Sequence, residues 1–171
     1  MAKKSKKSKI SIASIAVAAL AVVCLVLAIV GVCIDEWTTT EEVFGAKASV
    51  SFSDYSETAS KLQDAKDTAS DWGFEIEDDS KLTPMVAFGY IAVIAAAAVA
   101  ALAILNLLLK GKIFSLLTGI VGIAALAVGV ISIALTASFC GDYLVVGTGA
   151  ILTAVGAMGA GLAGASKFVL K

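Results

Sequence analysis

The sequence predicts an all-α integral membrane protein, a four-helix transmembrane bundle with a small α/β extracytoplasmic cap formed by the loop between helices 1 and 2. Three observations support this fold class. The chain has 171 residues and is 59% hydrophobic, more than one soluble domain needs for its interior. It contains four long apolar runs that lack Asp, Glu, Lys and Arg. A long polar segment, residues 35–83, separates the first run from the second.

Each apolar run is long enough to cross a bilayer, whose hydrocarbon core requires about 20 helical residues. Buried helices of soluble proteins rarely extend so far without a charged residue. The connections 110–112 and 140–142 are so short that the helices on either side of each must be antiparallel neighbours. We therefore predict transmembrane helices at residues 10–34, 84–109, 113–139 and 143–165.

The distribution of lysines predicts the orientation. Lysines occur in the N-terminal segment 1–9, in the connection 110–112 and in the C-terminal segment 166–171. The loop 35–83 instead contains thirteen acidic residues and four lysines, a net charge of −9. Because lysine-rich segments stay in the cytoplasm, we place both termini inside and the acidic loop and the turn 140–142 outside. The predicted location is the plasma (cytoplasmic) membrane.

A cluster of lysines precedes the first apolar run. This arrangement is also found in signal peptides, but the apolar run is about twice the usual length and no A-x-A cleavage site follows it, so we expect an uncleaved helix. The cluster is interpreted as a topology signal. The alternative is contact with anionic lipid headgroups, which phosphorylation of Ser5 or Ser8 would weaken. The cluster consists of Lys3, Lys4, Lys6, Lys7 and Lys9.

The long polar loop is expected to fold as the cap. Residues 38–52 are rich in Thr, Val and Phe around a turn at Gly45, which predicts a β-hairpin. Asp54 and Glu57 have the spacing of a capping box, and apolar residues then recur at helical spacing, which predicts an amphipathic helix at 55–72.

Four residues mark the edges of this cap. Thr83 and Pro84 are suited to be the N-cap and the first residue of the second transmembrane helix. Trp37 and Trp72 are predicted to anchor the cap at the membrane interface, where tryptophan is enriched.

Glycine and alanine dominate the fourth predicted transmembrane helix. Small residues spaced by four allow close helix approach in lipid. That face contacts either another helix of the same chain or a second copy, and these alternatives remain open in the sequence. The residues concerned are Gly156, Ala160, Gly164 and Gly161.

The three cysteines do not form a C-x-x-C pair, which disfavours a disulfide-exchange enzyme. Cys33 and Cys140 are at the outer ends of the first and third predicted helices, which places a structural disulfide within reach; free buried thiols are the alternative. Cys24 lies near mid-bilayer and is interpreted as a packing residue.

The residue types restrict the chemistry further. All thirteen basic residues are lysine and the chain has no histidine, which excludes Ser-His-Asp sites, histidine zinc ligands and arginine clamps. The acidic residues at 75–79 lack the spacing of a calcium loop and are interpreted as a solvated surface. We expect no enzyme activity, no cofactor, no bound metal and no nucleic-acid partner.

The layout resembles the claudin and peripheral myelin protein tetraspans. It has both ends inside, a large first outer loop predicted as strand, strand and helix, Trp37 just after the first helix, and a short second outer loop. The resemblance covers the whole chain as topology alone. The family's G-L-W motif with two spaced cysteines is missing, since residues 35–84 contain no cysteine, so no barrier or adhesion role is transferred to particular residues.

These observations predict a non-enzymatic structural or interaction protein, an adhesion or complex-organising component that acts through its acidic outer loop. Its expected partners are membrane lipids and another membrane or extracellular protein, or a second copy of itself. The alternative is an oligomeric channel or transporter subunit assembled through the glycine-rich helix.

Overall fold

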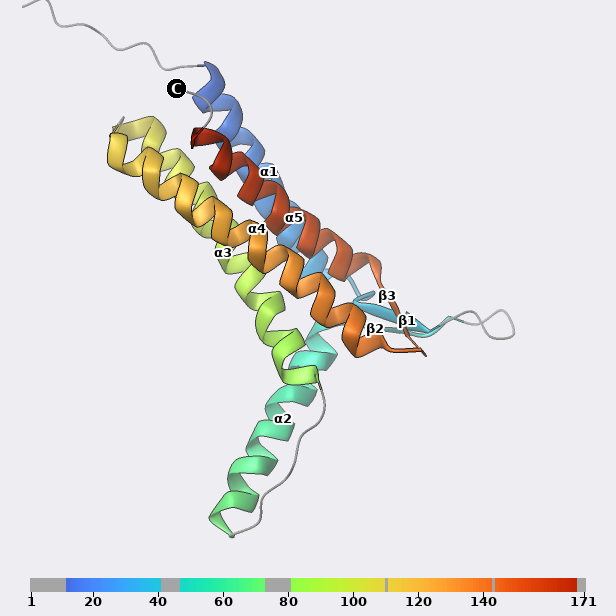
Figure 1. Cartoon of the computed structure of the whole chain (residues 1–171). Coiled ribbons are helices and arrows are strands. Elements are labelled where there is room, and N and C mark those ends of the chain that lie inside the picture. Colours follow the sequence, from blue (N-terminus) through green and yellow to red (C-terminus); the bar gives the residue numbers. More distant parts are fainter. Residues whose placement is uncertain (1–11, 41–46, 73–80, 110, 143, 169–171) are drawn as a thin grey trace, which may run out of the picture.

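The computed structural model of the protein describes residues 12–40, 47–72, 81–109, 111–142 and 144–168 (Figure 1). Four helices in this part of the chain are long and apolar enough to cross a membrane. They are α1 (Ile12–Cys33), α3 (Leu82–Leu109), α4 (Lys112–Cys140) and α5 (Thr148–Ala165), which continues into a short 3-10 helix, η1 (Ser166–Phe168). A further helix, α2 (Phe52–Asp71), is polar and projects away from one end of the bundle (Figure 1).

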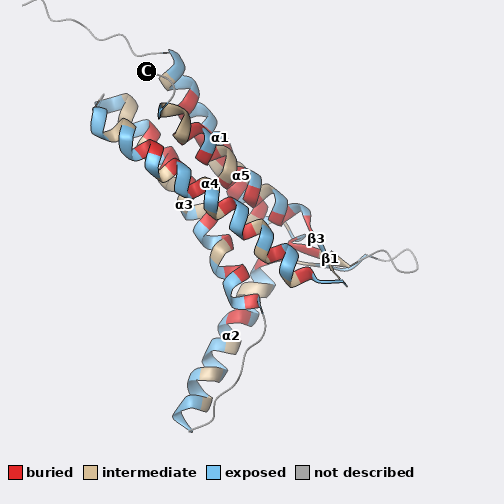
Figure 2. Cartoon of the chain, in the orientation of Figure 1, coloured by how far each residue is buried: buried red, intermediate tan, exposed pale blue. Residues whose placement is uncertain are grey.

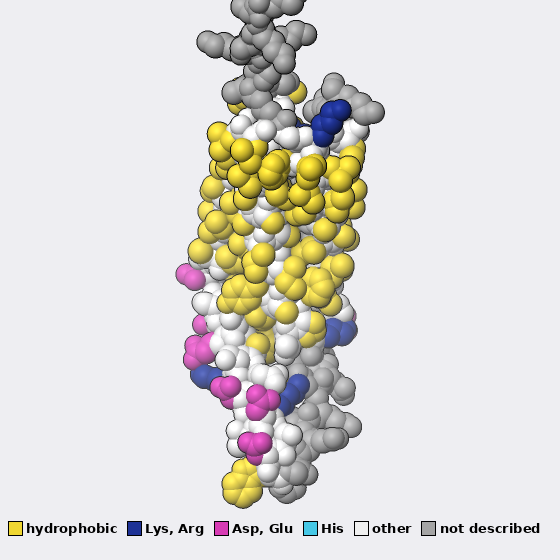
Figure 3. All heavy atoms as spheres, turned by 90° about the vertical axis from the view of Figure 1, so that its left-hand side faces the viewer, with side chains coloured by type: hydrophobic (Ala, Val, Ile, Leu, Met, Phe, Trp, Pro, Cys, Tyr) yellow, Lys and Arg dark blue, Asp and Glu magenta, His cyan; other side chains and the backbone are white. Residues whose placement is uncertain are grey.

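Apolar side chains cover the outside of the four-helix bundle (Figure 3). Isoleucine, leucine and valine residues from all four helices are exposed there. Acidic side chains gather beyond one end of this apolar belt, on the side where α2 projects (Figure 3). Soluble monomers rarely expose so much contiguous apolar surface. The four helices therefore have the character of a multi-pass membrane protein.

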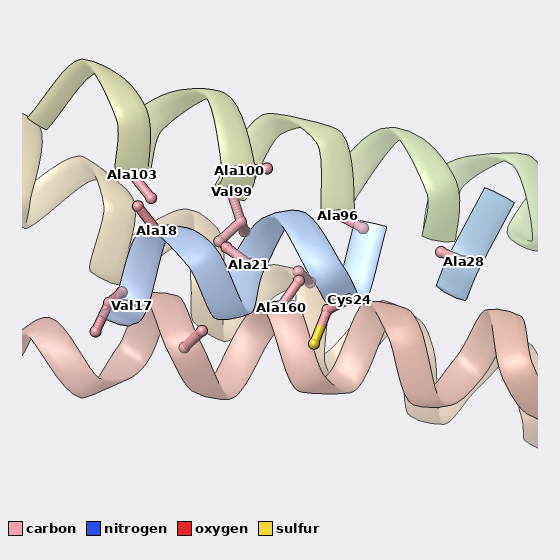
Figure 4. Close-up of a cluster of buried hydrophobic side chains, with 12 residues drawn as sticks. Val17, Ala18, Ala21, Cys24, Ala28, Ala96, Val99, Ala100, Ala103 and Ala160 are labelled. Carbon is pink, nitrogen blue, oxygen red and sulfur yellow. The ribbon is translucent and has the colours of Figure 1, made fainter. Parts of the chain in front are cut away.

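Small side chains hold the bundle together. α5 lies between α1 and α4, and α3 packs against α4 and α1. Where α1, α3 and α5 meet, the core consists mainly of alanines together with Val99 and Cys24 (Figure 4). Buried residues follow the facing sides of the helices, whereas most of α2 is exposed (Figure 2). Short side chains allow the helices to approach closely, which maximises van der Waals contact where lipid removes the hydrophobic driving force.

The glycine-rich face of α5 packs within the chain. A Cβ on Gly156 would lie 2.6 Å from the backbone nitrogen of Ala28 in α1, and one on Gly161 would lie 2.6 Å from the backbone nitrogen of Leu126 in α4. Gly164 also faces α4, and Ala160 is fully buried. Of the two alternatives that the sequence leaves open for these residues, the structure has the contact inside the bundle.

A three-stranded antiparallel sheet lies at the end of the bundle from which α2 projects, here called the sheet end. Its strands are β1 (Thr38–Thr40), β2 (Ser49–Val50) and β3 (Leu144–Val146), in the order β2-β1-β3. Thr38 pairs with Val50 on one side and with Val146 on the other. The two connections at this end, one before α3 and one before α5, therefore contribute to a single sheet.

β3 corrects the predicted start of the fourth transmembrane helix at residue 143. Leu144–Val146 is extended and hydrogen-bonded to β1, and α5 begins only at Thr148. The run Leu-Val-Val is apolar enough to extend a helix prediction, but its two β-branched residues also suit a strand. Pairing with β1 decides between the two conformations, and no local pattern reveals that pairing.

The start of α2 also differs from the prediction. The capping box consists of Ser51 and Asp54, not Asp54 and Glu57: the Asp54 N–H donates to the Ser51 hydroxyl at 3.1 Å, and the Ser51 N–H donates to the Asp54 carboxylate at 3.3 Å. Phe52, expected in the hairpin, is the first helical residue and is buried. Its burial among the aromatic side chains of the sheet end accounts for the earlier start. Gly45, the predicted hairpin turn, lies outside the described residues.

α3 begins before the predicted cap at Thr83. The Met85 N–H donates to the Lys81 carbonyl at 3.1 Å, so the helix starts at Leu82 and Pro84 is its third residue. Proline is tolerated there because the first N–H groups of a helix have no partner within it.

Candidate functional site

An aromatic cluster holds the sheet end together. The ring centroids of Trp37 and Phe52 are 4.4 Å apart, and those of Phe52 and Tyr90 are 4.9 Å apart in an edge arrangement. Tyr55 meets Phe139 of α4 in a similar edge arrangement at 5.2 Å. These contacts join the segment after α1 and the first turn of α2 to α3 and α4. Aromatic pairs of this geometry contribute about 0.5–1.5 kcal/mol each beyond the area they bury.

Trp37 is part of this core and not an interface anchor as predicted. Its side chain is fully buried, and its Nε1 atom has no hydrogen-bond partner among the described residues. It is buried because the chain turns after α1 and places the indole against Phe52, the first residue of α2. Trp72, the second predicted anchor, is 77% exposed at the C-cap of α2, the end that lies away from the bundle (Figure 1).

Two hydroxyl contacts fix the base of α2. The Tyr55 hydroxyl lies 2.6 Å from the Thr38 hydroxyl of β1, and the Ser56 hydroxyl lies 2.8 Å from the Tyr90 hydroxyl of α3. Burial raises the pKa of Tyr55 above the ordinary tyrosine value, while the hydrogen bond with Thr38 acts in the opposite direction. The phenol therefore stays protonated at neutral pH. The two contacts lie on consecutive residues of α2 and reach different elements, so they restrict rotation of the helix about its axis.

Backbone contacts join the sheet to the bundle. The Gly147 N–H donates to the Trp37 carbonyl, and the Gly149 N–H donates to the Glu36 carbonyl, both at 2.9 Å. A Cβ on Gly147 would collide with the Glu36 carbonyl oxygen. Only glycine allows the segment before α5 to approach the segment after α1 this closely. The sheet is consequently held directly on the ends of α1 and α5.

Lys81 adds a contact between α3 and α4 at this end. Its Nζ lies 2.5 Å from the Ser138 hydroxyl and 3.3 Å from the Ser138 carbonyl oxygen. That carbonyl belongs to the last turn of α4, where the helix macrodipole favours a cation. The ammonium therefore stabilises the end of α4 beside the first residue of α3.

α2 presents an acidic surface. Phe52–Asp71 contains five acidic residues and two lysines, a net charge of −3. Hydrogen bonds from the side chain and backbone of Ser51 lower the pKa of Asp54. Lys61 and Glu57 form an exposed ion pair at 2.6 Å, and this hydrogen bond raises the pKa of Lys61. Of the α2 residues, only Phe52 and Ala59 are buried, so most of the helix is available for contact with another molecule.

The cysteines are free thiols in the structure. Cys33 is exposed at the end of α1, while Cys140 and Cys24 are buried. Of the two alternatives for Cys33 and Cys140, a disulfide or free thiols, the structure has free thiols. In the part of the chain that the structure describes, no group of three His, Cys, Asp or Glu residues is placed to hold a metal ion. The acidic residues at 75–79 lie outside that part.

The predicted lipid-binding lysines, Lys3 to Lys9, also lie outside the described residues. Where α1 begins, the Lys167 ammonium donates to the Ser14 hydroxyl at 3.2 Å and joins η1 to the first turn of α1.

Several residues of the site were not predicted from the sequence as a group. Phe52, Tyr55 and Tyr90 come from two helices and meet only in the fold, and Gly147 gains its role from contact with a segment about 110 residues earlier in the chain. The signal that points to them is weak: two aromatic residues at or just before the start of the predicted amphipathic helix, one aromatic residue early in the second apolar run, and a glycine directly after a β-branched pair.

Comparison of the chain with protein-family models, with curated proteins and with solved structures finds no match.

Proposed function

We propose that this protein is a non-enzymatic four-pass component of the plasma membrane that binds another protein through its acidic outer end and so organises a complex. The single observation that carries the proposal is the position of α2, an acidic helix that extends beyond the bundle from a closely packed base (Figure 1). The lysine distribution supports cytoplasmic termini and an outward-facing sheet end.

The attachment of α2 supports a role in recognition. Aromatic packing around Phe52 and the hydroxyl contacts of Tyr55 and Ser56 fix its direction before any partner arrives. A binding element that is ordered in advance avoids the entropy cost of ordering on association. A simple connection between two transmembrane helices would not need a helix of this length.

The charge of the outer end favours a basic partner. The loop 35–83 has a net charge of −9, and α2 exposes its acidic side chains. Such a surface attracts cationic partners and increases their association rate. A second copy of this chain would bring an equal negative charge, so we propose a different protein as the partner.

The channel alternative loses its main support. It depends on a free glycine-rich face, but Gly156 faces α1 and Gly161 faces α4 within one chain. The proposal therefore expects that purified protein does not make liposomes permeable to small solutes. Solute passage that Gly156→Leu abolishes would favour the channel instead.

Site-specific photo-cross-linking in native membranes tests the proposed function. A photo-reactive residue at Ser60, which is exposed on α2, should yield a cross-linked partner that mass spectrometry identifies. The same group at Val130, exposed on the apolar belt of α4, is the control for random collisions in the membrane.

A charge test accompanies the cross-linking. Asp64→Lys combined with Asp71→Lys should remove most of the product, while the neutral pair Asp64→Asn and Asp71→Asn should reduce it less, because attraction to a basic surface scales with charge. Equal yields from Ser60 and Val130, or a product that is insensitive to charge reversal, would contradict the proposal.

A further inference from the structure

β3 is an edge strand with one side open. In the order β2-β1-β3 it pairs with β1 on one side, and no described strand pairs with the other. An open edge presents unpaired N–H and C=O groups that attract another extended chain. β3 therefore offers backbone hydrogen bonds to an additional strand.

The two faces of the sheet differ. Thr38 and its partner Val146 face the aromatic cluster, where Thr38 is fully buried and Val146 packs against the cluster residues. Thr39 and its partner Val145 alternate to the opposite face, and Val145 is 45% exposed. A strand added at β3 would accordingly have one apolar face toward the bundle and one face toward water.

The edge has one of the usual protections and lacks several others. Natural proteins protect edge strands by keeping them very short, as the three-residue β3 is, with lysine, proline, a bulge or inward-pointing charges, or with a covering helix or loop. Leu144–Val146 contains no charged residue and no proline, and its regular pairing with β1 includes no bulge. Backbone hydrogen bonds from Gly147 and Gly149 keep this apolar edge in place against the bundle. This ordered, apolar edge of β3 therefore supports a role in binding another extended chain.

The surroundings of the edge are acidic. Asp142 is exposed two residues before β3. Asp35 and Glu36 are exposed before β1, and the Glu36 carbonyl accepts a hydrogen bond from Gly149 just beyond β3. These charges disfavour a second copy of the chain, which would bring the same acidic residues to the same place. They favour an occupant with lysine or arginine side chains.

We propose that the open edge of β3 binds an extended segment of a partner protein as a fourth strand, with apolar side chains toward the bundle and lysine or arginine side chains toward Asp142 and Glu36. Backbone pairing supplies affinity and the alternating side chains supply selectivity, as in other cases of strand addition. The inference rests on the proposed function and specifies where and how the basic partner is bound.

A peptide-binding experiment on the full chain tests it. The protein is placed in nanodiscs of phosphatidylcholine, and the probe is a fluorescent peptide of alternating lysine and valine, read by anisotropy. A peptide of alternating glutamate and valine controls for charge. A third peptide has the lysine and valine sequence with alternate backbone nitrogens methylated, which removes strand pairing and retains the charge.

Binding of the lysine and valine peptide should weaken about tenfold or more on backbone methylation, because the peptide then loses its backbone hydrogen bonds to β3. On the protein, Val145→Lys should weaken binding to a similar degree. The matched control Ala13→Lys adds the same charge on an exposed residue in the first turn of α1, at the opposite end of the bundle, and should have an effect of less than about threefold. The glutamate and valine peptide should not bind.

The outcomes separate this inference from the proposed function. Binding that resists both backbone methylation and Val145→Lys overturns strand addition, while the proposed acidic recognition stands. Absence of binding by the lysine and valine peptide also overturns strand addition, and the cross-linking from Ser60 then decides the proposed function by itself. The methylated peptide acts on the unaltered protein, so a folding defect in Val145→Lys does not affect that comparison.

Discussion

The hydroxyl groups of Ser56 and Tyr90 lie 2.8 Å apart and connect α2 to α3. This contact restricts the direction in which the acidic helix leaves the bundle. Tyr90→Phe keeps the ring packed against Phe52 and removes only the hydroxyl. We expect a loss of up to about 1 kcal/mol in the stability of the sheet end and faster hydrogen exchange in α2, measured by mass spectrometry. Ser56→Ala should have the same effect, and the double variant should add little. Fully additive losses would show that the two groups act independently.

Close backbone approach at Gly147 is expected to limit substitution there. Gly147→Ala would push a methyl group against the Glu36 carbonyl, and we expect a loss of about 3 kcal/mol or more in unfolding free energy. Gly141→Ala is the matched control, because Gly141 has a φ of 56° but nothing within 4 Å of its added Cβ. Its cost should be about 1–3 kcal/mol, because a φ of 56° with a ψ of −136° is a backbone conformation that residues with side chains rarely adopt. Denaturation in detergent measures both, and an equal or smaller loss at Gly147 would refute the steric argument.

Helix packing inside the bundle predicts different effects at two glycines of α5. A Cβ on Gly156 would meet backbone atoms of α1, whereas one on Gly159 would meet the Sγ of Cys24, the end of a side chain that can rotate. Gly156→Ala should therefore lower the unfolding free energy by about 1–3 kcal/mol, and Gly159→Ala by less. The mass of the protein in detergent, measured by light scattering, should be the same for both variants. A change in mass for Gly156→Ala alone would point to contact between copies.

The capping box at the start of α2 gives a pH-dependent prediction. Ser51→Ala removes the hydroxyl that accepts from the Asp54 N–H and donates to its carboxylate, and should cost about 0.5–2 kcal/mol of local stability. It should also raise the pKa of Asp54 toward the ordinary value. Because the folded pKa of Asp54 is lowered, its stabilisation is complete above the ordinary carboxyl pKa and is lost as the pH falls through the lowered value.

Carboxyl NMR shifts and amide exchange in the first turn of α2 measure these two effects. Ser60→Ala, in the exposed middle of the same helix, should leave both unchanged. An Asp54 pKa that does not move in Ser51→Ala would disprove the capping contact.

The free thiols predict a simple labelling pattern. In the folded protein without a reducing agent, maleimide should modify Cys33 and leave Cys24 and Cys140 unmodified until the chain is unfolded, because only Cys33 is exposed. Intact mass spectrometry counts the labels, and Cys33→Ser should remove the single label. Labelling of Cys33 only after reduction would show the disulfide that the sequence also permits.

The amino-acid sequence by itself determines the four spans and the separation of charge. Runs such as 84–109 are apolar over their entire length, and partitioning into lipid depends on that local property without reference to any partner. The acidic helix was also predictable, although its start shifted by three residues because the burial of Phe52 competes with local capping signals.

Tertiary structure decided how the sheet end is assembled. From the sequence alone, Leu144–Val146 resembles the start of a helix, and only its pairing with β1 makes it a strand. Trp37 likewise resembles an interface anchor, and only its burial against Phe52 makes it a core residue. The sequence allows Gly156 to face either a neighbouring copy or another helix of the same chain, and the packing of the helices makes α1 its neighbour. Hydropathy and helical spacing are properties of one segment, whereas strand pairing, aromatic burial and helix contact are properties of two segments that meet. Their energies exist only once the fold brings both segments together.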